Sequence, residues 1–166
     1  MIFEHLNGIN SKFIVRMKYF FQDEHHYFMA LEYCPGGELF KHIKDCRTGR
    51  PRLSMKAVKF YSACIVNSLE ILHQNKIVYK DLKPENIVIS KDGFPKLTDF
   101  GLCIHEFPGA TPSEQFNRKK ATLHITAPEI LRKSQFSSAS DYWSLGCFIY
   151  ELIVGKPPFY DELSTF

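Results

Sequence analysis

The segment from residue 141 to residue 154 constrains the fold most. It is apolar on nearly every side of a helix, and such a helix has to be covered by other elements all round. Ser140 is suited to cap its start, and Gly155 ends it. Its most apolar part, residues 145–154, is about half a membrane span and contains Glu151, so we expect a helix buried in the middle of one core.

A second helix is predicted over residues 54–75, with Ser54 as its N-cap. Apolar residues recur there at spacings of three and four, which is the period of a helix with one buried face: Val58, Tyr61, Ile65, Leu69 and Leu72. The polar segment 111–120 reads as a mobile loop.

Two hairpins are predicted before and after that helix. Residues 13–21 and 27–33 are rich in β-branched and aromatic side chains, with a polar turn at 22–26. Residues 87–90 and 94–98 flank an Asp-Gly turn. Strands come first in the chain and helices last, so we expect an α+β fold around one core.

Composition excludes several classes of function. The chain has 166 residues and a net charge of +3, and its basic residues are scattered, which argues against nucleic-acid binding. Its five cysteines are odd in number and widely spaced, so neither a zinc site nor a disulfide framework is expected. No signal peptide is apparent. We expect reduced thiols in an intracellular protein, cytoplasmic or nuclear.

Four polar residues flank the second predicted hairpin. Asp81, Lys83 and Asn86 precede the second hairpin, and Asp99 follows it, so the hairpin should bring Asn86 close to Asp99. An amide oxygen and a carboxylate suit Mg²⁺. Lys83 can offset charge on a phosphoryl group, and Asp81 can accept a proton from a hydroxyl or orient it.

These residues lie in motifs that resemble those of eukaryotic protein kinases. The motifs are Tyr-Lys-Asp-Leu-Lys-Pro-Glu-Asn (79–86), Thr-Asp-Phe-Gly (98–101), Ala-Pro-Glu (127–129) and Asp-Tyr-Trp-Ser-Leu-Gly (141–146). Each alone is weak, but four in register are specific. Lys83 is the Ser/Thr-kinase form, and segments 32–40 and 60–66 resemble the cyclic-nucleotide-dependent and protein-kinase-C-like group.

The resemblance implies a protein serine/threonine kinase that uses ATP and Mg²⁺, with a partial domain. Residues 1–33 would be a remnant of the small lobe, 34–37 the hinge and 38–166 a truncated large lobe. The expected nucleotide-binding residues are Leu31, Glu32, Cys34, Glu38, Val88 and Thr98, and the expected metal ligands are Asn86 and Asp99. Leu6, Met17, Tyr79 and Phe100 match the stacked apolar residues of the active state, although plain core residues would fill the same places.

The resemblance also implies a protein substrate. Glu38, Glu85 and Glu151 match carboxylates that in relatives hold basic residues before the target hydroxyl, and Thr122 belongs to the same side of the site. Three carboxylates there would favour arginine-rich substrates. The alternative is that each is an ordinary solvated or capping carboxylate.

Several parts of the family pattern are absent from the sequence. None of the nine glycines forms a G-x-G motif, and no Val-Ala-Ile-Lys strand supplies a lysine for the α- and β-phosphates. Lys80 replaces the arginine that holds the activating phosphate in relatives, which keeps the charge but loses the bidentate fork.

Three readings follow. The first is an ATP-dependent protein kinase of which this chain is a part with little activity alone. The second is a non-catalytic, kinase-like interaction module or truncated product, and the third is an unrelated fold with chance motifs. The intact Asp81, Lys83, Asn86 and Asp99 favour the first, because a binding module needs none of them.

Overall fold

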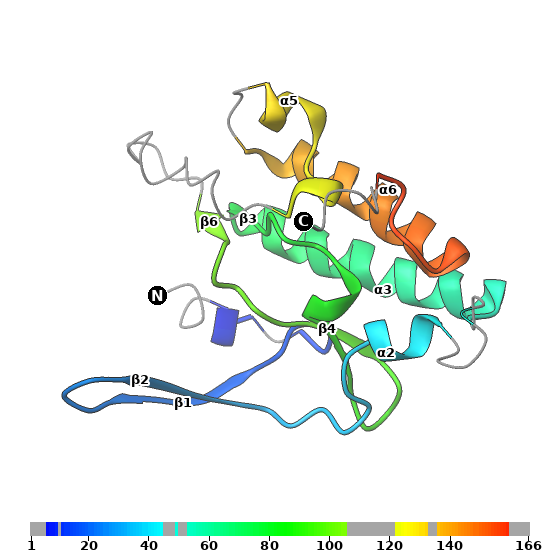
Figure 1. Ribbon diagram of the computed structural model, residues 1–166. Helices are drawn as coiled ribbons and strands as arrows, with labels where there is room; N and C mark the ends of the chain where they lie inside the picture. The colour runs from blue at the N-terminus through cyan, green and yellow to red at the C-terminus, as the bar shows by residue number, and fades with distance from the viewer. Residues whose placement is uncertain are drawn as a thin grey trace.

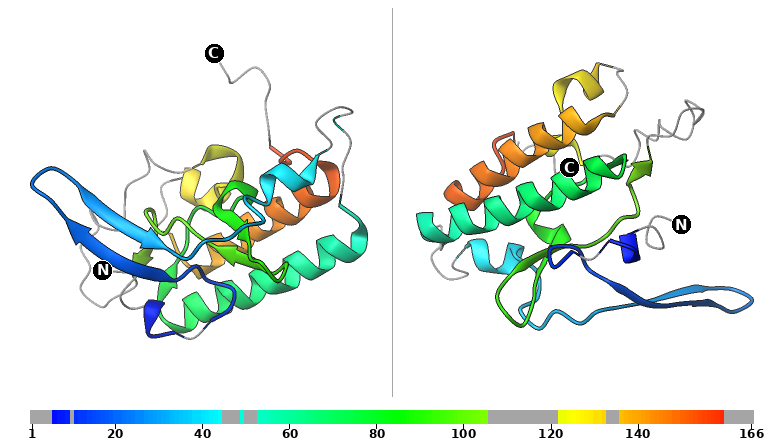
Figure 2. Two further views of the ribbon diagram at one scale, coloured as in Figure 1. Left: turned by 90° about the horizontal axis from the view of Figure 1, so that it is seen from below. Right: turned by 180° about the vertical axis from the view of Figure 1, so that it is seen from behind.

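The structure is a computed structural model that describes residues 6–9, 11–44, 49, 53–105, 122–132 and 136–159. Two long helices, α3 (Met55–Gln74) and α6 (Ser138–Val154), run side by side and form one layer, with the short strands on the other side of α3 (Figures 1 and 2). The segment 111–120, expected to be a loop, lies outside the described residues.

Helix α3 confirms its prediction closely. The Ser54 hydroxyl accepts a hydrogen bond from the Ala57 N–H at 3.2 Å, which satisfies one of the free donors of the first turn. Its buried face comprises Val58, Cys64, Ile65, Ser68, Leu69 and Leu72. Just past its end, Lys76 has a φ of 59°, the left-handed conformation that commonly terminates a helix.

Helix α6 exists, but the expectation that it is buried on every face is wrong. Its inner face packs on α3 through residues such as Leu145, Phe148 and Leu152. The opposite face is exposed to solvent along Tyr142, Trp143, Tyr150 and Ile153. The reason is that, within the described residues, α3 and the neighbouring short elements cover α6 from one side only (Figure 2).

The helix also starts earlier than expected: the Ser137 N–H donates to the Ser140 Oγ at 3.3 Å, so Ser140 helps to cap from inside the first turn.

The first hairpin consists of β1 (Met17–Gln22) and β2 (Tyr27–Leu31), paired antiparallel. Asp23 Oδ1 accepts hydrogen bonds from the N–H groups of His25 and His26, at 2.8 and 2.7 Å, which fixes the predicted turn. The first strand begins later than predicted, because residues 13–15 leave the hairpin and bond to Leu97 instead.

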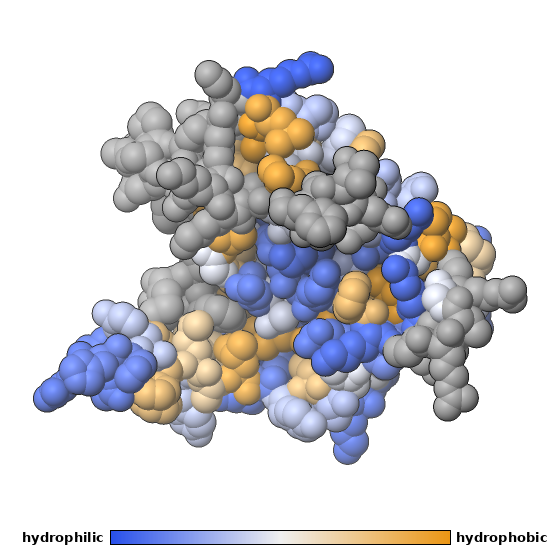
Figure 3. Space-filling view, in the orientation of Figure 1, coloured by the Kyte–Doolittle hydropathy of each residue, from blue (hydrophilic) through white to orange (hydrophobic). Residues whose placement is uncertain are grey.

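The β1–β2 hairpin exposes aromatic side chains on both faces. Phe21 stacks on Phe28 with ring centroids 4.9 Å apart, and Phe20 stacks on Tyr27 at 6.0 Å. All four are exposed, and Figure 3 shows apolar surface at the lower left behind a hydrophilic tip. Such cross-strand pairs stabilise a hairpin locally, but they bury little apolar area from water.

The second hairpin lies between the helices and the first hairpin. It pairs β4 (Ile87–Ile89) with β5 (Pro95–Leu97) in the register Ile87↔Leu97, and Gly93 in its turn has a φ of 80°. Pro95 opens β5, as expected for a residue without an N–H. Around this hairpin lie short elements: α2 (Phe40–Ile43), β3 (Ile77–Val78), η1 (Pro84–Asn86), β6 (Ile104–His105), η3 (Leu123–Ile125) and α5 (Pro128–Leu131).

One main core joins these elements, and the predicted α+β fold is confirmed. It contains fully buried side chains from α3, α6 and the β4–β5 hairpin, including Leu69, Phe148, Ile87 and Leu97. Among the described residues, no helix has both the length and the apolarity that crossing a membrane requires.

Candidate active site

The β4–β5 hairpin brings the predicted metal ligands to one end. Asn86 directly precedes β4 and Asp99 follows β5 by one residue, Thr98. The Thr98 N–H donates to the Asn86 carbonyl at 3.0 Å, which continues the hairpin ladder up to the site. The sequence-based expectation that the hairpin draws Asn86 and Asp99 together therefore agrees with the geometry.

Asp81 is the most heavily bonded side chain of the four. It is only 4% exposed, and its Oδ2 accepts a hydrogen bond from the Asn86 amide at 2.8 Å and pairs with the Lys83 ammonium at 2.8 Å. Its Oδ1 accepts a hydrogen bond from the Thr122 hydroxyl at 2.6 Å, and Lys83 also donates to that hydroxyl at 3.0 Å. A buried carboxylate held from three sides has one fixed orientation.

The Asn86 and Asp99 side chains fit a hard divalent cation such as Mg²⁺. The Asn86 amide nitrogen is committed to Asp81, through both its carboxylate and its carbonyl, so the amide oxygen is the atom left for a metal. Asp99 is exposed, and the one hydrogen bond recorded for its carboxylate comes from the Gly101 N–H, at 3.2 Å to Oδ1. Both residues thus keep oxygen atoms for Mg²⁺.

The backbone of the two residues before Asp81 is held by Asp141, which has no exposed surface. Its Oδ2 accepts a hydrogen bond from the Tyr79 N–H and its Oδ1 one from the Lys80 N–H, both at 2.8 Å. His73 Nε2 lies 2.8 Å from the same Oδ2. Lys80 has a φ of 73°, a conformation that costs free energy in a residue with a Cβ atom. The buried carboxylate therefore compensates a strained turn immediately before Asp81.

Three of the expected nucleotide-binding residues, Glu32, Cys34 and Glu38, lie along the segment that joins β2 to α2. Gly36 and Gly37 pair with Ile89: the Gly36 N–H donates to the Ile89 carbonyl at 3.0 Å, and the Ile89 N–H to the Gly37 carbonyl at 2.8 Å. A Cβ atom on Gly36 would lie 2.6 Å from the Ile89 Cβ, so only glycine allows this approach.

This segment also joins Glu38 to Val88 through an antiparallel bridge, so the structure brings those two predicted residues together. Leu31 is exposed at the end of β2, while Cys34 and Thr98 are half-buried. Burial raises the pKa of the Cys34 thiol, which keeps it protonated. The Glu32 side chain instead turns to Lys96, with the two charged atoms 2.6 Å apart.

The four stacked apolar residues expected from the resemblance belong to one cluster. The rings of Tyr79 and Phe100 meet edge to face at 5.6 Å, Leu6 is buried with them, and Met17 packs against the same core. The Tyr79 hydroxyl donates to the Thr98 carbonyl, which links this cluster to the residue just before Asp99.

The predicted substrate-side carboxylates divide into two places. Burial raises the pKa of Glu151 to about 7, and the nearby charge of Glu85 adds to that rise, so these two carboxylates are close enough to interact. Glu85 itself is exposed. Glu38 lies in the segment between β2 and α2, where its carboxylate pairs with Lys41 at 3.3 Å.

Sequence reasoning missed three features of the site. His73 supports Asp141 from α3, the Glu32–Lys96 ion pair joins β5 to the segment after β2, and the Lys80 ammonium lies 4.2 Å from the centre of the Phe136 ring. Burial lowers the pKa of Lys80. No periodicity or spacing signals any of these pairs, because their partners are far apart in the chain. Among the described residues, no group of three or more His, Cys, Asp or Glu side chains is arranged to hold a metal.

Comparison of the sequence with known proteins shows the family of this chain. The protein kinase domain profile covers residues 2–165. The chain is 43% identical to a Caenorhabditis elegans ribosomal protein S6 kinase beta, and 38% identical both to human serine/threonine-protein kinase Sgk2 and to the human cAMP-dependent protein kinase catalytic subunit PRKX. Each match covers 95% of this chain.

These matches span only 27 to 41% of the relatives' own lengths. The predicted likeness to the cyclic-nucleotide-dependent and protein-kinase-C-like group is confirmed, and members of the family generally use ATP and Mg²⁺ to phosphorylate proteins. By its profile match and its relatives, this chain belongs to the protein kinase domain family, among the serine/threonine kinases.

Proposed function

We propose that this chain is the catalytic-loop part of an ATP- and Mg²⁺-dependent protein serine/threonine kinase. The observation that carries the proposal is the fixed Asp81 carboxylate, which Asn86, Thr122 and Lys83 hold in a single orientation. Two of these partners also have a use of their own in phosphoryl transfer, because Asn86 can hold Mg²⁺ and the Lys83 charge can stabilise the transferring group.

In this proposal Asp81 orients the hydroxyl of a substrate serine or threonine and accepts its proton. Oδ2 accepts from both Asn86 and Lys83, whereas the recorded bond to Oδ1 comes from Thr122 and leaves a second lone pair there for that hydroxyl. Lys83 is half-buried beside Asp81, where its charge can stabilise the transferring phosphoryl group.

The nucleotide and its metal are proposed to lie between the hinge and the end of the β4–β5 hairpin. Asn86 and Asp99 would hold Mg²⁺, and the metal would neutralise part of the phosphate charge. Residues 34–37 would form the hinge, with the backbone at Glu32 and Cys34 facing adenine and Val88 beneath it. The bridge between Glu38 and Val88 supports this placement, because it fixes the hinge segment directly over β4. Residues 1–33 and 38–166 would then belong to the small and the large lobe.

The substrate is proposed to be a protein segment with basic residues before the target hydroxyl. The proximity of Glu85 and Glu151 supports this, because a cationic side chain placed between them would relieve their mutual repulsion. Glu38 would provide a third, separate contact.

Calorimetric titration of Mg-ATP into the purified chain tests the nucleotide site. Asp99→Asn is the informative variant, because Asp99 has a φ of 54° and asparagine tolerates that conformation better than alanine. Asp92→Asn, at the exposed β4–β5 turn, is the matched control. We expect binding that requires Mg²⁺, weakens at least about tenfold in Asp99→Asn and is unchanged in Asp92→Asn. Equal binding by all three proteins would refute the assigned role of Asp99.

A second candidate is a non-catalytic interaction module, which the exposed aromatic faces of the β1–β2 hairpin favour. For these 166 residues alone we expect little or no turnover, because the sequence has no G-x-G motif and no recognisable phosphate-binding lysine. In a protein completed with those parts, Asp81→Asn should abolish activity. Full turnover in that variant would overturn the role assigned to Asp81.

A further inference from the structure

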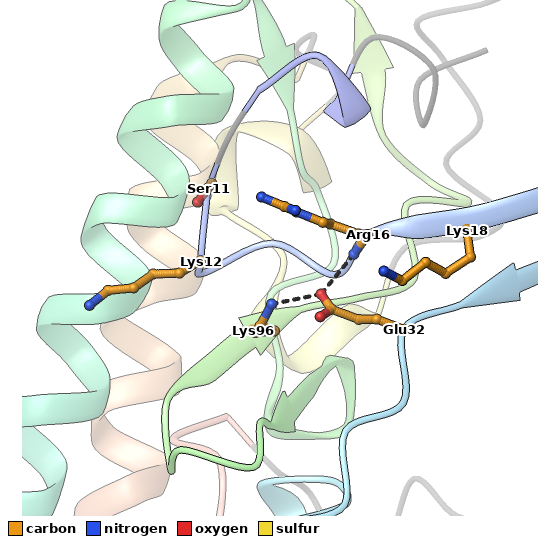
Figure 4. Close-up of a pocket in the computed structure, with 6 residues that line it drawn as sticks. All are labelled: Ser11, Lys12, Arg16, Lys18, Glu32 and Lys96. Atoms are coloured by element: carbon orange, nitrogen blue, oxygen red, sulfur yellow. Dashed lines mark hydrogen bonds and ion pairs between the residues drawn. The ribbon is translucent and has the colours of Figure 1, made fainter.

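Several charged side chains around the candidate site have a partner of opposite charge. Glu32 pairs with Lys96 at 2.6 Å (Figure 4), and Lys83 pairs with Asp81 at 2.8 Å. Lys80 differs, because among the described residues no carboxylate forms an ion pair with its ammonium. Lys80 is nevertheless buried, and a buried charge without a partner costs free energy.

The Phe136 ring is the partner that the structure gives to this ammonium. The Lys80 ammonium lies over the ring, 4.2 Å from its centre, and both residues are buried. The negative face of an aromatic ring attracts a cation within about 6 Å of the ring centre, and the attraction is stronger where water is excluded. Burial also lowers the pKa of Lys80, as expected for an ammonium that has lost part of its hydration.

Phe136 is itself held in place by packing. It belongs to a second, small hydrophobic cluster with Val78, Ala127 and Ile130. Ala127 directly precedes α5 and Ile130 lies within it, so this cluster fixes the ring against the segment that follows Thr122. The position of the ring therefore does not depend on its contact with Lys80.

Two consecutive residues, Lys80 and Asp81, thus contact this part of the chain at two places. The Asp81 carboxylate accepts a hydrogen bond from the Thr122 hydroxyl at 2.6 Å, and the Lys80 ammonium lies over Phe136. The Lys80 backbone has a φ of 73°, and its N–H donates to Asp141 at 2.8 Å. A strained conformation persists only where surrounding contacts fix it. The backbone and the side chain of Lys80 therefore both fix the turn before Asp81.

We infer that Phe136 is a positioning residue, whose ring binds the Lys80 ammonium and thereby helps to fix the orientation of the neighbouring Asp81 carboxylate. The functional part of this role rests on the proposed function of Asp81. The alternative is that Phe136 only fills its small cluster. A leucine would fill that space nearly as well, but it has no negative face for the ammonium.

Amide hydrogen exchange of the ligand-free chain, measured by NMR, tests the contact. The reporters are the N–H groups of positions 79 and 80, which Asp141 holds. Phe136→Leu removes the ring, Lys80→Met removes the charge, and the double variant completes the cycle. Ile130→Val removes one methylene from the same cluster and is the matched control.

The ring and the charge should act on exchange together. We expect Phe136→Leu to accelerate exchange at least about threefold more in the parent chain than beside Lys80→Met. Ile130→Val should have the same effect in both backgrounds. Lys80→Arg keeps a cation for the ring and should behave like the parent chain.

Calorimetric titration of Mg-ATP into the same proteins tests the effect on the site. Asp81 accepts a hydrogen bond from the Asn86 amide, so a loosened Asp81 should also loosen Asn86. The affinity should fall about threefold in Phe136→Leu and in Lys80→Met, and no further in the double variant, because both changes remove the same contact.

The outcomes separate the inference from the proposed function. Equal acceleration by Phe136→Leu in the two backgrounds would overturn the inference, because the ring would then act through packing alone. Unchanged Mg-ATP affinity in variants with coupled exchange would overturn the positioning role. A parent chain that binds no Mg-ATP would refute the proposed nucleotide site and not the contact, which the exchange measurement decides by itself.

Discussion

The Asp141 carboxylate accepts a hydrogen bond from the Lys80 N–H at 2.8 Å, across 61 positions of the chain. This contact ties the first turn of α6 to the residue that precedes Asp81. Lys80 is held there at a positive φ, so the buried acceptor and the strained turn depend on each other.

Asp141→Asn is expected to destabilise the fold by about 3 kcal/mol. The amide presents one oxygen where the carboxylate presents two, so a buried N–H of Tyr79 or Lys80 loses its charged acceptor. Urea unfolding followed by circular dichroism measures the change. Asp92→Asn, at an exposed turn, should stay within about 0.5 kcal/mol of the parent chain. An Asp141→Asn variant as stable as that control would show that the carboxylate does not support the loop.

A substitution at the end of α3 is predicted to stabilise the fold. Lys76 has a φ of 59° at an exposed position, and glycine adopts this conformation more easily because it has no Cβ atom that could clash. Lys76→Gly should therefore raise the free energy of unfolding by about 0.5 to 1 kcal/mol. Lys59→Gly, within the same helix, should lower it by about 1 kcal/mol. Thermal or urea unfolding compares the two, and a loss of stability in both variants would contradict the proposed cause.

Much of the fold, and part of the candidate site, could be predicted from local sequence. The period of α3, its Ser54 cap and the Asp-Gly turn between β4 and β5 are short-range signals, and each corresponds to an observed element. The hairpin turn also explains why Asn86 and Asp99 could be expected to meet. Contacts between distant segments left no such signal. The Glu32–Lys96 pair spans 64 positions and depends on how residues 13–15 cross beside β5, which no periodicity encodes.

The error about α6 has a related cause. Hydrophobicity along residues 141–154 reports how much apolar surface the helix carries, and not which elements are present to cover it. Among the described residues, α3 and the neighbouring short elements cover one face of α6. Trp143 on the other face is left 38% exposed, although it stacks on Phe159 with ring centroids 5.7 Å apart.

Glu151 makes the stability of the chain depend on pH. Its pKa is raised from 4.5 to about 7, first by burial and then by the charge of Glu85, while Lys44 opposes the shift. Between these two values the unfolded chain releases the proton and the folded chain retains it. The contribution to stability is therefore fully present below about pH 4.5 and is lost as the pH rises to about 7.

Glu151→Gln should remove this dependence. At pH 8 the variant should be more stable than the parent chain by up to about 3 kcal/mol, and below pH 4.5 the two should converge. Urea unfolding at several pH values measures the difference, and Glu24→Gln on the exposed turn of the first hairpin is the control. A parent chain and a Glu151→Gln variant that differ equally at every pH would exclude an elevated pKa at Glu151.

Variants of Asn86 and Asp99 should differ in their effect on stability, although both weaken ligand binding. Asn86 is buried and donates to both the carbonyl and the carboxylate of Asp81, so Asn86→Ala should cost about 2 kcal/mol of folding free energy. Asp99 is exposed and accepts only from Gly101 among the recorded hydrogen bonds, so Asp99→Asn should change stability by less than about 0.5 kcal/mol. Both variants should weaken Mg-ATP binding, because both remove an oxygen ligand or its support.

Urea unfolding and calorimetry on the same preparations test this pattern. If Asp99→Asn lost as much stability as Asn86→Ala, its weaker binding would reflect damage to the loop, and the assignment of Asp99 as a metal ligand would lose its support.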